Sequence, residues 1–258
     1  MDKKSIEKRE QEILNALRLT NQLSIEDVIK LLNVSESTVR RIFISLEKKG
    51  LIFRTYGGIS LARGNDENYT YERLETSCVE EKSRIGAAAA ALIDNHDIIF
   101  LDTGTTVPHM CMALAKRIEN GEISSLKIFT TSLVNLNLLS RVTSVILIGG
   151  IYRPSRRDFY GFITEEALRG LHFGKCFLGT DGYTGDGFTT TDFDTARLNR
   201  IAMEHSDKKI ILTDSSKCGK NSMVNYCPAK SIDCIITDSV TEEIAADFSD
   251  NDIEIKIV

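Results

Sequence analysis

The sequence predicts an α/β protein with an N-terminal winged helix-turn-helix and a C-terminal, mostly parallel α/β domain. Three observations predict this fold. Helical apolar stripes fill the first fifty residues, two short β-prone runs flank a Gly-Gly pair within 51–61, and apolar strand-like segments alternate with helical ones from residue 79 onward. We expect domains at 1–61 and 79–258, joined by a polar linker at 62–78.

Three helical patterns come first. Residues 5–19 carry an apolar stripe, and Ser24 with Asp27 three residues later resembles a capping arrangement that begins a second, short helix. After a tight break at 33–34, Ser35 can cap a third helix that runs to about residue 49. Helix, turn and helix at this spacing, followed by a hairpin, are typical of a winged helix-turn-helix.

The third helix has two different faces. At about 100° per residue, one side gathers Val39, Ile42, Phe43 and Leu46. That apolar side should pack on the first two helices, so the polar side is free to enter a DNA major groove. Charged residues opposite an apolar stripe are also common on solvated helices, but the turn spacing and the wing favour double-stranded DNA as the partner. The expected DNA-binding residues are Ser35, Ser37, Thr38, Arg40, Arg41, Ile44, Arg54 and Tyr56.

The body of the chain alternates between strands and helices, which predicts a parallel sheet covered on both faces. A helix-like Ala-rich segment precedes the first strand. The expected strands lie at 97–102, 126–131, 143–150, 175–180, 208–214, 231–238 and 252–258.

Polar residues and glycines follow most of these strands, at the edge where open α/β sheets bind ligands. The hydroxyls and free N–H groups of 103–106 would cradle a phosphate. Each group also has a plain structural interpretation: Ser132 as a helix cap, Arg153 as a solvated charge, Asp181 and Lys217 as an ion pair. The expected effector-binding residues are Asp102, Thr103, Gly104, Thr105, Thr106, Thr131, Ser132, Gly150, Arg153, Asp181 and Lys217.

The motifs resemble one family over nearly the whole chain. The segment STVRRIFISLEKKGLIFRTYGGI resembles the DNA-binding signature of the DeoR family of bacterial transcription regulators. The segments LDTGTT, TTSLVN, LIGGIYR, FLGTDGYT, TDSSKCG and IDCIITDS resemble its sensor domain, which is similar to ribose-5-phosphate isomerase. The chain departs from the family pattern at Ile42, Thr131 and Cys218.

The resemblance implies a carbohydrate-responsive regulator, expected to be a repressor, with a sugar phosphate or related metabolite as effector. Two alternatives stay open: a sugar-phosphate isomerase with residual activity, and a DNA-binding, oligomerising protein without a ligand. In the first, Asp181 would be the base and Lys217 would offset the charge of an enediolate. Gly182, Tyr183 and Thr184 stand where the isomerase carries additional acidic residues, which favours binding without turnover.

Composition sets further expectations. The net charge is −5, yet residues 1–60 hold 11 Lys/Arg against 8 Asp/Glu, a mildly basic balance that suits a nucleic-acid module. The six cysteines lack Cys-x-x-Cys spacing and the four histidines are scattered, so we expect buried thiols, no metal, no cofactor and no catalytic residues. The charged N-terminus and the lack of a membrane-length apolar run predict a cytoplasmic protein, and operator binding favours a homo-oligomer.

Overall fold

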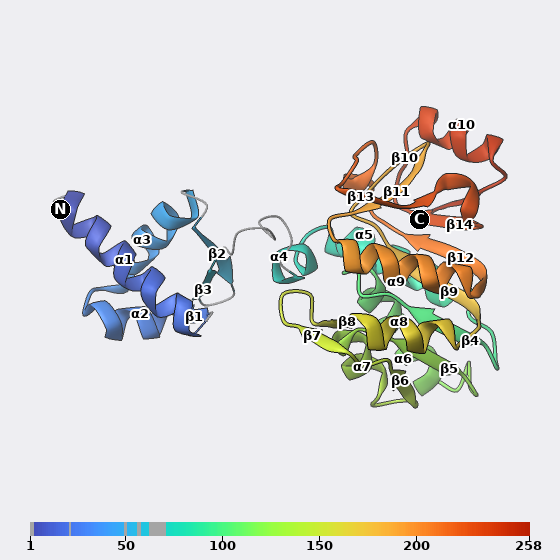
Figure 1. Ribbon diagram of the computed structural model, residues 1–258, viewed down its shortest axis with the longest axis horizontal. Helices are drawn as coiled ribbons and strands as arrows, with labels where there is room; N and C mark the ends of the chain where they lie inside the picture. The colour runs from blue at the N-terminus through green and yellow to red at the C-terminus, as the bar shows by residue number, and fades with distance from the viewer. Residues whose placement is uncertain (1–2, 21, 49–50, 56–57, 62–70) are drawn as a thin grey trace. The chain divides into compact units, whose positions relative to one another are not determined.

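The computed structural model describes residues 3–20, 22–48, 51–55, 58–61 and 71–258 (Figure 1). Contacts within the chain divide it into an N-terminal unit, Met1–Arg73, and a C-terminal unit, Leu74–Val258. Of the linker expected at 62–78, residues 62–70 lie outside the described part, and Tyr71–Glu75 form the short helix α4.

The N-terminal unit has the three helices and the hairpin that the sequence predicts. Its elements are α1 (Lys3–Thr20), β1 (Gln22–Ser24), α2 (Ile25–Leu32), α3 (Glu36–Lys48), β2 (Ile52–Thr55) and β3 (Gly58–Leu61). The strands form an antiparallel sheet in the order β1-β3-β2, so β1 adds a third strand that the sequence does not reveal. The apolar face expected on α3 is confirmed, because Val39, Ile42, Phe43 and Leu46 are all at most 4% exposed.

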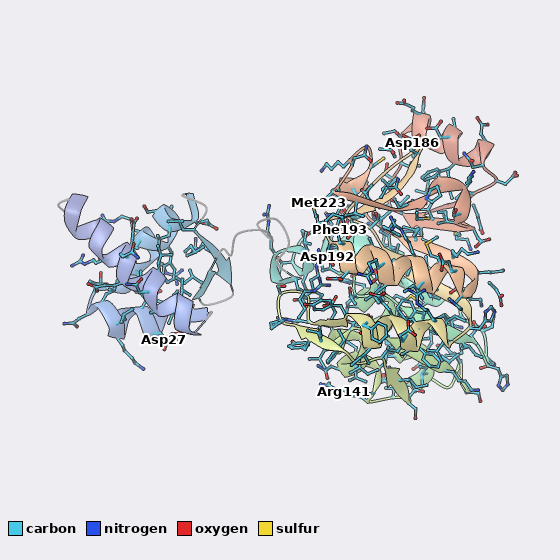
Figure 2. The ribbon with its side chains drawn as sticks, viewed as in Figure 1. Asp27, Arg141, Asp186, Asp192, Phe193 and Met223 are labelled. Carbon is cyan, nitrogen blue, oxygen red and sulfur yellow. The ribbon has the colours of Figure 1, made fainter. Side chains whose placement is uncertain are left out.

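A capping box begins α2, as the sequence predicts. The Ser24 hydroxyl accepts a hydrogen bond from the Asp27 backbone N–H at 3.0 Å, and the Asp27 carboxylate accepts one from the Ser24 N–H at 2.9 Å. Asp27 is labelled in Figure 2. Asn33 ends the helix in the left-handed conformation, with its N–H donating to Ile29 at 2.8 Å. These two ends fix where the turn before α3 begins.

Ser24→Ala should destabilise the N-terminal unit by about 1 kcal/mol, because the substitution removes the acceptor for an unpaired helix N–H. Urea unfolding of the full chain, with hydrogen exchange of the α2 amides as the local probe, measures this loss. Ser24→Thr keeps the hydroxyl and is the matched control. Equal exchange rates in the Ala and Thr variants would show that the cap contributes nothing to α2.

The C-terminal unit is built on a seven-stranded sheet in the order β15-β14-β12-β9-β4-β5-β6. All neighbouring strands are parallel, and all seven strands predicted from the sequence are in this sheet. The strands are β4 (Ile98–Leu101), β5 (Lys127–Thr130), β6 (Val145–Leu147), β9 (Phe173–Gly179), β12 (Ser206–Leu212), β14 (Cys234–Thr237) and β15 (Glu254–Ile257).

Helices cover both faces of this sheet, and alternate strand residues enter two separate cores (Figure 1). Leu101 and Phe177 join the core under α5 (Val79–Ala90), α6 (Val107–Glu119) and α7 (Leu133–Leu139). Phe100 and Leu178 join the core under α8 (Phe162–Arg169), α9 (Phe193–Glu204) and α10 (Glu242–Asp250). The turns after the strands are therefore held on a rigid frame.

Two smaller strand groups are not foreseen in the sequence. A hairpin of β7 (Ile151–Arg153) and β8 (Asp158–Tyr160) follows β6. A three-stranded antiparallel sheet joins β10 (Gly182–Thr184), β11 (Gly187–Thr190) and β13 (Val224–Pro228). All five strands are at most five residues long, and β10 and β11 are rich in Gly and Thr, so they carry little apolar alternation. Among the described residues no helix is both long and apolar enough to span a membrane.

Candidate DNA-binding surface and effector site

The solvent face of α3 carries the side chains that the sequence predicts for DNA contact. Arg40 and Arg41 are exposed, and Ile44 is 42% exposed although it is apolar. Arg40 pairs with Glu36 one turn earlier at 2.6 Å, but an exposed pair of this kind contributes little and exchanges readily for a phosphate. The face is therefore cationic and accessible, with an apolar side chain suited to a thymine methyl.

The hydroxyl residues lie at the start of α3. The Ser35 hydroxyl is 3.0 Å from both the Ser37 and the Thr38 hydroxyls, so the three groups form one cluster at the positive end of the helix. Arg54 is exposed on β2. Tyr56, the remaining residue predicted to contact DNA, lies outside the described residues.

The turn at 102–106 joins β4 to α6, as predicted. The Asp102 carboxylate accepts a hydrogen bond from the Gly179 N–H at 2.9 Å, which ties the turn to the end of β9. Gly104 faces Gly179 so closely that a Cβ atom on Gly104 would lie 3.2 Å from the Gly179 Cα atom. The two loops therefore pack tightly, and a side chain at position 104 would push them apart by a few tenths of an ångström. Thr105 stays half-buried, whereas Thr103 and Thr106 are buried.

Burial raises the pKa of Asp102 above its usual value, although the backbone N–H group of Gly179 opposes this shift. Asn135 lies next to Asp102 and is fully buried: its Nδ2 donates to the Asp102 carbonyl at 2.8 Å, while its Oδ1 has no hydrogen-bond partner among the described residues. Asn135 belongs to the predicted TTSLVN motif, but we did not expect it to be part of the site.

Lys82 is the main site residue that the sequence does not reveal. It lies in the first turn of α5, only 1% exposed, and its ammonium donates a hydrogen bond to the Thr105 hydroxyl at 3.0 Å. Burial lowers the pKa of Lys82, and Asp214 opposes this by attraction. The charge of Lys217 lowers it further by repulsion. A buried cation and a hydroxyl therefore meet beside the turn, within the field of a second lysine.

The other residues predicted at the strand ends have structural partners. Thr131 and Ser132 are buried, and the Ser132 hydroxyl caps α7 by accepting from the Asn135 N–H at 3.3 Å. A Cβ atom on Gly150 would lie 2.1 Å from the Thr164 hydroxyl, so that glycine allows close packing. The structure thus agrees with the interpretation of Ser132 as a helix cap.

Arg153 is held in an ion-pair network. Its guanidinium binds Asp158 through two hydrogen bonds of 3.0 and 2.8 Å, pairs with Asp192 at 2.7 Å, and donates to Thr195 at 3.1 Å. Burial lowers the pKa of Arg153, but Asp158 and Asp192 outweigh it and raise the pKa above its usual value. A solvated loop charge, the alternative interpretation from the sequence, does not describe this side chain, which is 11% exposed.

Asp181 and Lys217 are both half-buried at the same edge of the sheet. The Asp181 carboxylate accepts three hydrogen bonds, one from Thr190 at 3.0 Å and two from Thr191 at 2.8 and 2.9 Å. Those donors hold the carboxylate in a loop network. The alternative of a structural ion pair with Lys217 therefore has no support in the contacts of Asp181.

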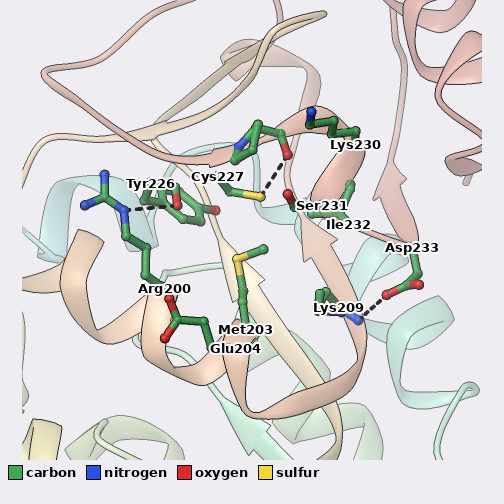
Figure 3. Close-up of a pocket in the computed structure, with 11 residues that line it drawn as sticks. Arg200, Met203, Glu204, Lys209, Tyr226, Cys227, Lys230, Ser231, Ile232 and Asp233 are labelled. Atoms are coloured by element: carbon green, nitrogen blue, oxygen red, sulfur yellow. Dashed lines mark hydrogen bonds between the residues drawn. The ribbon is translucent and has the colours of Figure 1, made fainter.

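A pocket of about 570 Å³ lies elsewhere in the C-terminal unit (Figure 3). It lies near the edge where β12 and β14 begin, and none of the predicted effector-binding residues lines it. The lining residues are Arg200, Met203, Glu204, Lys209, Tyr226, Cys227, Pro228, Lys230, Ser231, Ile232 and Asp233. Burial raises the pKa of the Cys227 thiol to about 12, so this thiol is protonated and unreactive at neutral pH.

Comparison with known proteins covers both units. Residues 9–64 match a family model described as a DeoR-like helix-turn-helix domain, and residues 77–239 match one described as the DeoR C terminal sensor domain. The chain is 32% identical to the lactose phosphotransferase system repressor of Staphylococcus epidermidis, over 88% of this chain and 90% of the relative. It is 30% identical to the HTH-type transcriptional repressor GlcR of Bacillus subtilis, over 95% and 93%.

Solved structures show a remote likeness. Ribose 5-phosphate isomerase A of Methanocaldococcus jannaschii matches with a TM-score of 0.41 and 17% identity, over 55% of each chain. The chain thus spans about half the length of that enzyme.

The relatives in the sequence comparison are named as regulators and repressors, which confirms a DNA-binding regulator rather than an enzyme. The match of both family models to successive parts of the chain shows that it belongs to the DeoR family of transcriptional regulators.

Proposed function

We propose that the protein represses an operon for carbohydrate utilisation and leaves its operator when a phosphorylated sugar binds at the 102–106 turn. The observation that carries the proposal is the hydrogen bond between the buried Lys82 ammonium and Thr105 at a turn that opens a helix, with the charge of Lys217 acting on Lys82. Two lysines beside backbone N–H groups favour an anion of phosphate size. The relatives named as repressors, one of them for a lactose phosphotransferase system, support the carbohydrate assignment.

The sugar part of the effector would lie towards the neighbouring strand ends. The buried Oδ1 of Asn135 lacks a partner, and a ligand hydroxyl is a donor that would satisfy such an acceptor. The carboxylate of Asp181 can also accept from sugar hydroxyls at its end of the sheet.

The repressor would act in the cytoplasm as a homo-oligomer. Two or more copies place α3 helices on repeated operator half-sites, which multiplies affinity for DNA. Large exposed apolar side chains support self-association: Phe162 is 75% and Ile163 69% exposed on α8, and Ile151 is 58% exposed on β7. A Cβ atom on Gly161 would lie 3.3 Å from Ile151, so Ile151 lies beside the residue that precedes α8.

A thermal-shift screen tests the proposal. Ribose 5-phosphate, glucose 6-phosphate and fructose 1-phosphate are compared with their unphosphorylated sugars and with inorganic phosphate. A sugar phosphate at about 100 times its Kd should add about 2.7 kcal/mol to the stability of the folded unit. The same compound should weaken binding to a duplex, selected from random sequence with the wild-type protein, by roughly 5- to 150-fold in fluorescence anisotropy.

Thr105→Val is the matched variant for this screen. It removes the hydroxyl beside Lys82 while keeping the side-chain shape, so effector affinity should fall and affinity for the duplex should not. If unphosphorylated sugars stabilise the protein as well as their phosphates, the phosphate assignment is wrong. If no compound shifts the melting temperature, the regulator without a ligand is the better description.

A further inference from the structure

The buried ammonium of Lys82 joins two places in the C-terminal unit. On one side it donates to the Thr105 hydroxyl at 3.0 Å, and on the other to the backbone carbonyl of Leu74. Leu74 belongs to α4, so the second contact places a cation at the C-terminus of a helix, where it is favourable. Leu74 and Glu75 are also the first residues of the C-terminal unit, directly after the segment that leads from the DNA-binding unit.

The Leu74 carbonyl has other donors. The Ser77 hydroxyl donates to it at 2.9 Å and the Ser77 N–H at 3.2 Å, in addition to Lys82. A carbonyl oxygen has two lone pairs, so three donors compete for it. Departure of Lys82 therefore leaves the carbonyl satisfied, and the usual cost of an unpaired buried acceptor does not arise. The Lys82 contact can break without disrupting the fold around it.

The charges beside Lys82 favour its transfer to an anion. Burial disfavours its charged form, Asp214 stabilises it, and Lys217 repels it. An anion held by the 103–106 turn would attract Lys82 directly, since its partner Thr105 is part of that turn. A charge-assisted hydrogen bond to phosphate is roughly twice as strong as one between neutral groups, so the anion competes well with the Leu74 carbonyl.

A second contact holds the same segment. Arg157, in the loop between β7 and β8, lies 3.9 Å from the Glu75 carboxylate. The hairpin that carries it also carries Arg153, one of the residues predicted to bind the effector. At this distance and exposure the Arg157 pair is weak, so Lys82 is the stronger of the two contacts.

We propose that Lys82 transmits effector binding to the start of the C-terminal unit: an anion on the 103–106 turn withdraws the ammonium from the Leu74 carbonyl and releases residues 74–77. The inference rests on the proposed function, because the anion is the phosphate of the sugar. Lys82 is thus a positioning residue for the segment that leads to the DNA-binding unit, in addition to being a ligand for the effector.

Hydrogen exchange on the full-length protein tests the contact without any ligand. Lys82→Met keeps most of the side-chain volume and removes the charge, so amides within 71–78 should exchange roughly tenfold faster than in the wild type. Lys82→Gln retains a donor and serves as the second variant, with a smaller increase. Lys116→Met removes an exposed lysine from α6, outside the proposed site, and should leave these amides unchanged.

Ribose 5-phosphate and inorganic phosphate are the probes for the second arm. Either probe should speed exchange over 71–78 in the wild type and in Lys217→Met, at a higher concentration in the latter. Neither probe should change exchange over 71–78 further in Lys82→Met. Without any probe, the affinity of Lys82→Met for the selected duplex should already be as low as that of the wild type saturated with probe. A thermal melt of each variant checks that the unit is folded.

Two results would overturn the inference. One is that the amides within 71–78 exchange at the wild-type rate in both Lys82 variants. The other is a probe-induced increase in Lys82→Met as large as in the wild type. If neither probe binds the wild type, the sugar-phosphate assignment fails instead, and the ligand-free comparison still decides whether Lys82 holds the segment.

Discussion

Arg41→Ala should weaken binding to the selected duplex by roughly 10- to 100-fold, the loss expected for one arginine that contacts a guanine edge or a phosphate. Arg41 lies on the exposed face of α3, and the apolar face opposite is fully used by the core of the N-terminal unit. The double variant Arg40→Ala/Arg41→Ala should abolish specific binding. Fluorescence anisotropy across a salt series measures both effects.

The salt series separates two roles for Arg41. A phosphate contact lowers the dependence of log K on log salt by about one, whereas a base contact lowers discrimination between sequences. Arg84→Ala, which removes an exposed arginine from α5 in the other unit, is the matched control and should leave DNA binding unchanged. The effector-induced thermal shift should persist in Arg41→Ala. Loss of both activities in that variant would contradict two independent units.

Arg153→Met should destabilise the C-terminal unit by about 3 kcal/mol or more, because it leaves two largely buried carboxylates without their cation. Asp158 is 1% and Asp192 18% exposed, and both bind the same guanidinium. Arg141→Met removes an exposed arginine elsewhere in the unit and is the control (Figure 2). Chemical denaturation followed by circular dichroism gives the difference between the two variants.

The same network predicts a pH dependence. Burial raises the pKa of Asp192, but the hydrogen bond and charge of Arg153 outweigh it, so the pKa in the folded state lies below 3.8. The stability that Asp192 contributes is present above that value and is lost as the pH falls through the lowered pKa.

Adding Asp158→Asn and Asp192→Asn to Arg153→Met should restore part of the stability lost in Arg153→Met at neutral pH. No restoration would show that Arg153 acts through packing rather than charge.

The main architecture follows from local patterns in the sequence. Apolar runs such as 97–102 and 208–214 mark strands that are buried on both faces, and all seven such runs enter the large sheet. The start of α2 was predicted equally well: Ser24 and Asp27 form the expected capping box, because the two residues are three positions apart. Signals of this kind depend only on near neighbours, so a single sequence reveals them.

The parts that the sequence did not reveal depend on distant neighbours. Lys82 resembles any surface lysine in an Ala-rich helix, and its burial follows from contacts with Thr105 and Leu74, on either side of it in the chain. Arg153 pairs with Asp192, which lies 39 positions later in the sequence, so its ion pairs could not be inferred from YRPSRR alone. Charged groups carry no periodic signal when they are buried singly.

The order of strands in the large sheet determines when that sheet can form during synthesis of the chain. β4 and β9 are neighbours at its centre, yet β9 ends at Gly179, long after β4 has left the ribosome. The helices and hairpin near the amino terminus have their own core and can fold as soon as they emerge. The large sheet cannot be completed until β9 has been synthesised. A ribosome that stops between residues 62 and 172 would therefore release a fragment that carries the helix-turn-helix unit without a complete sensor domain.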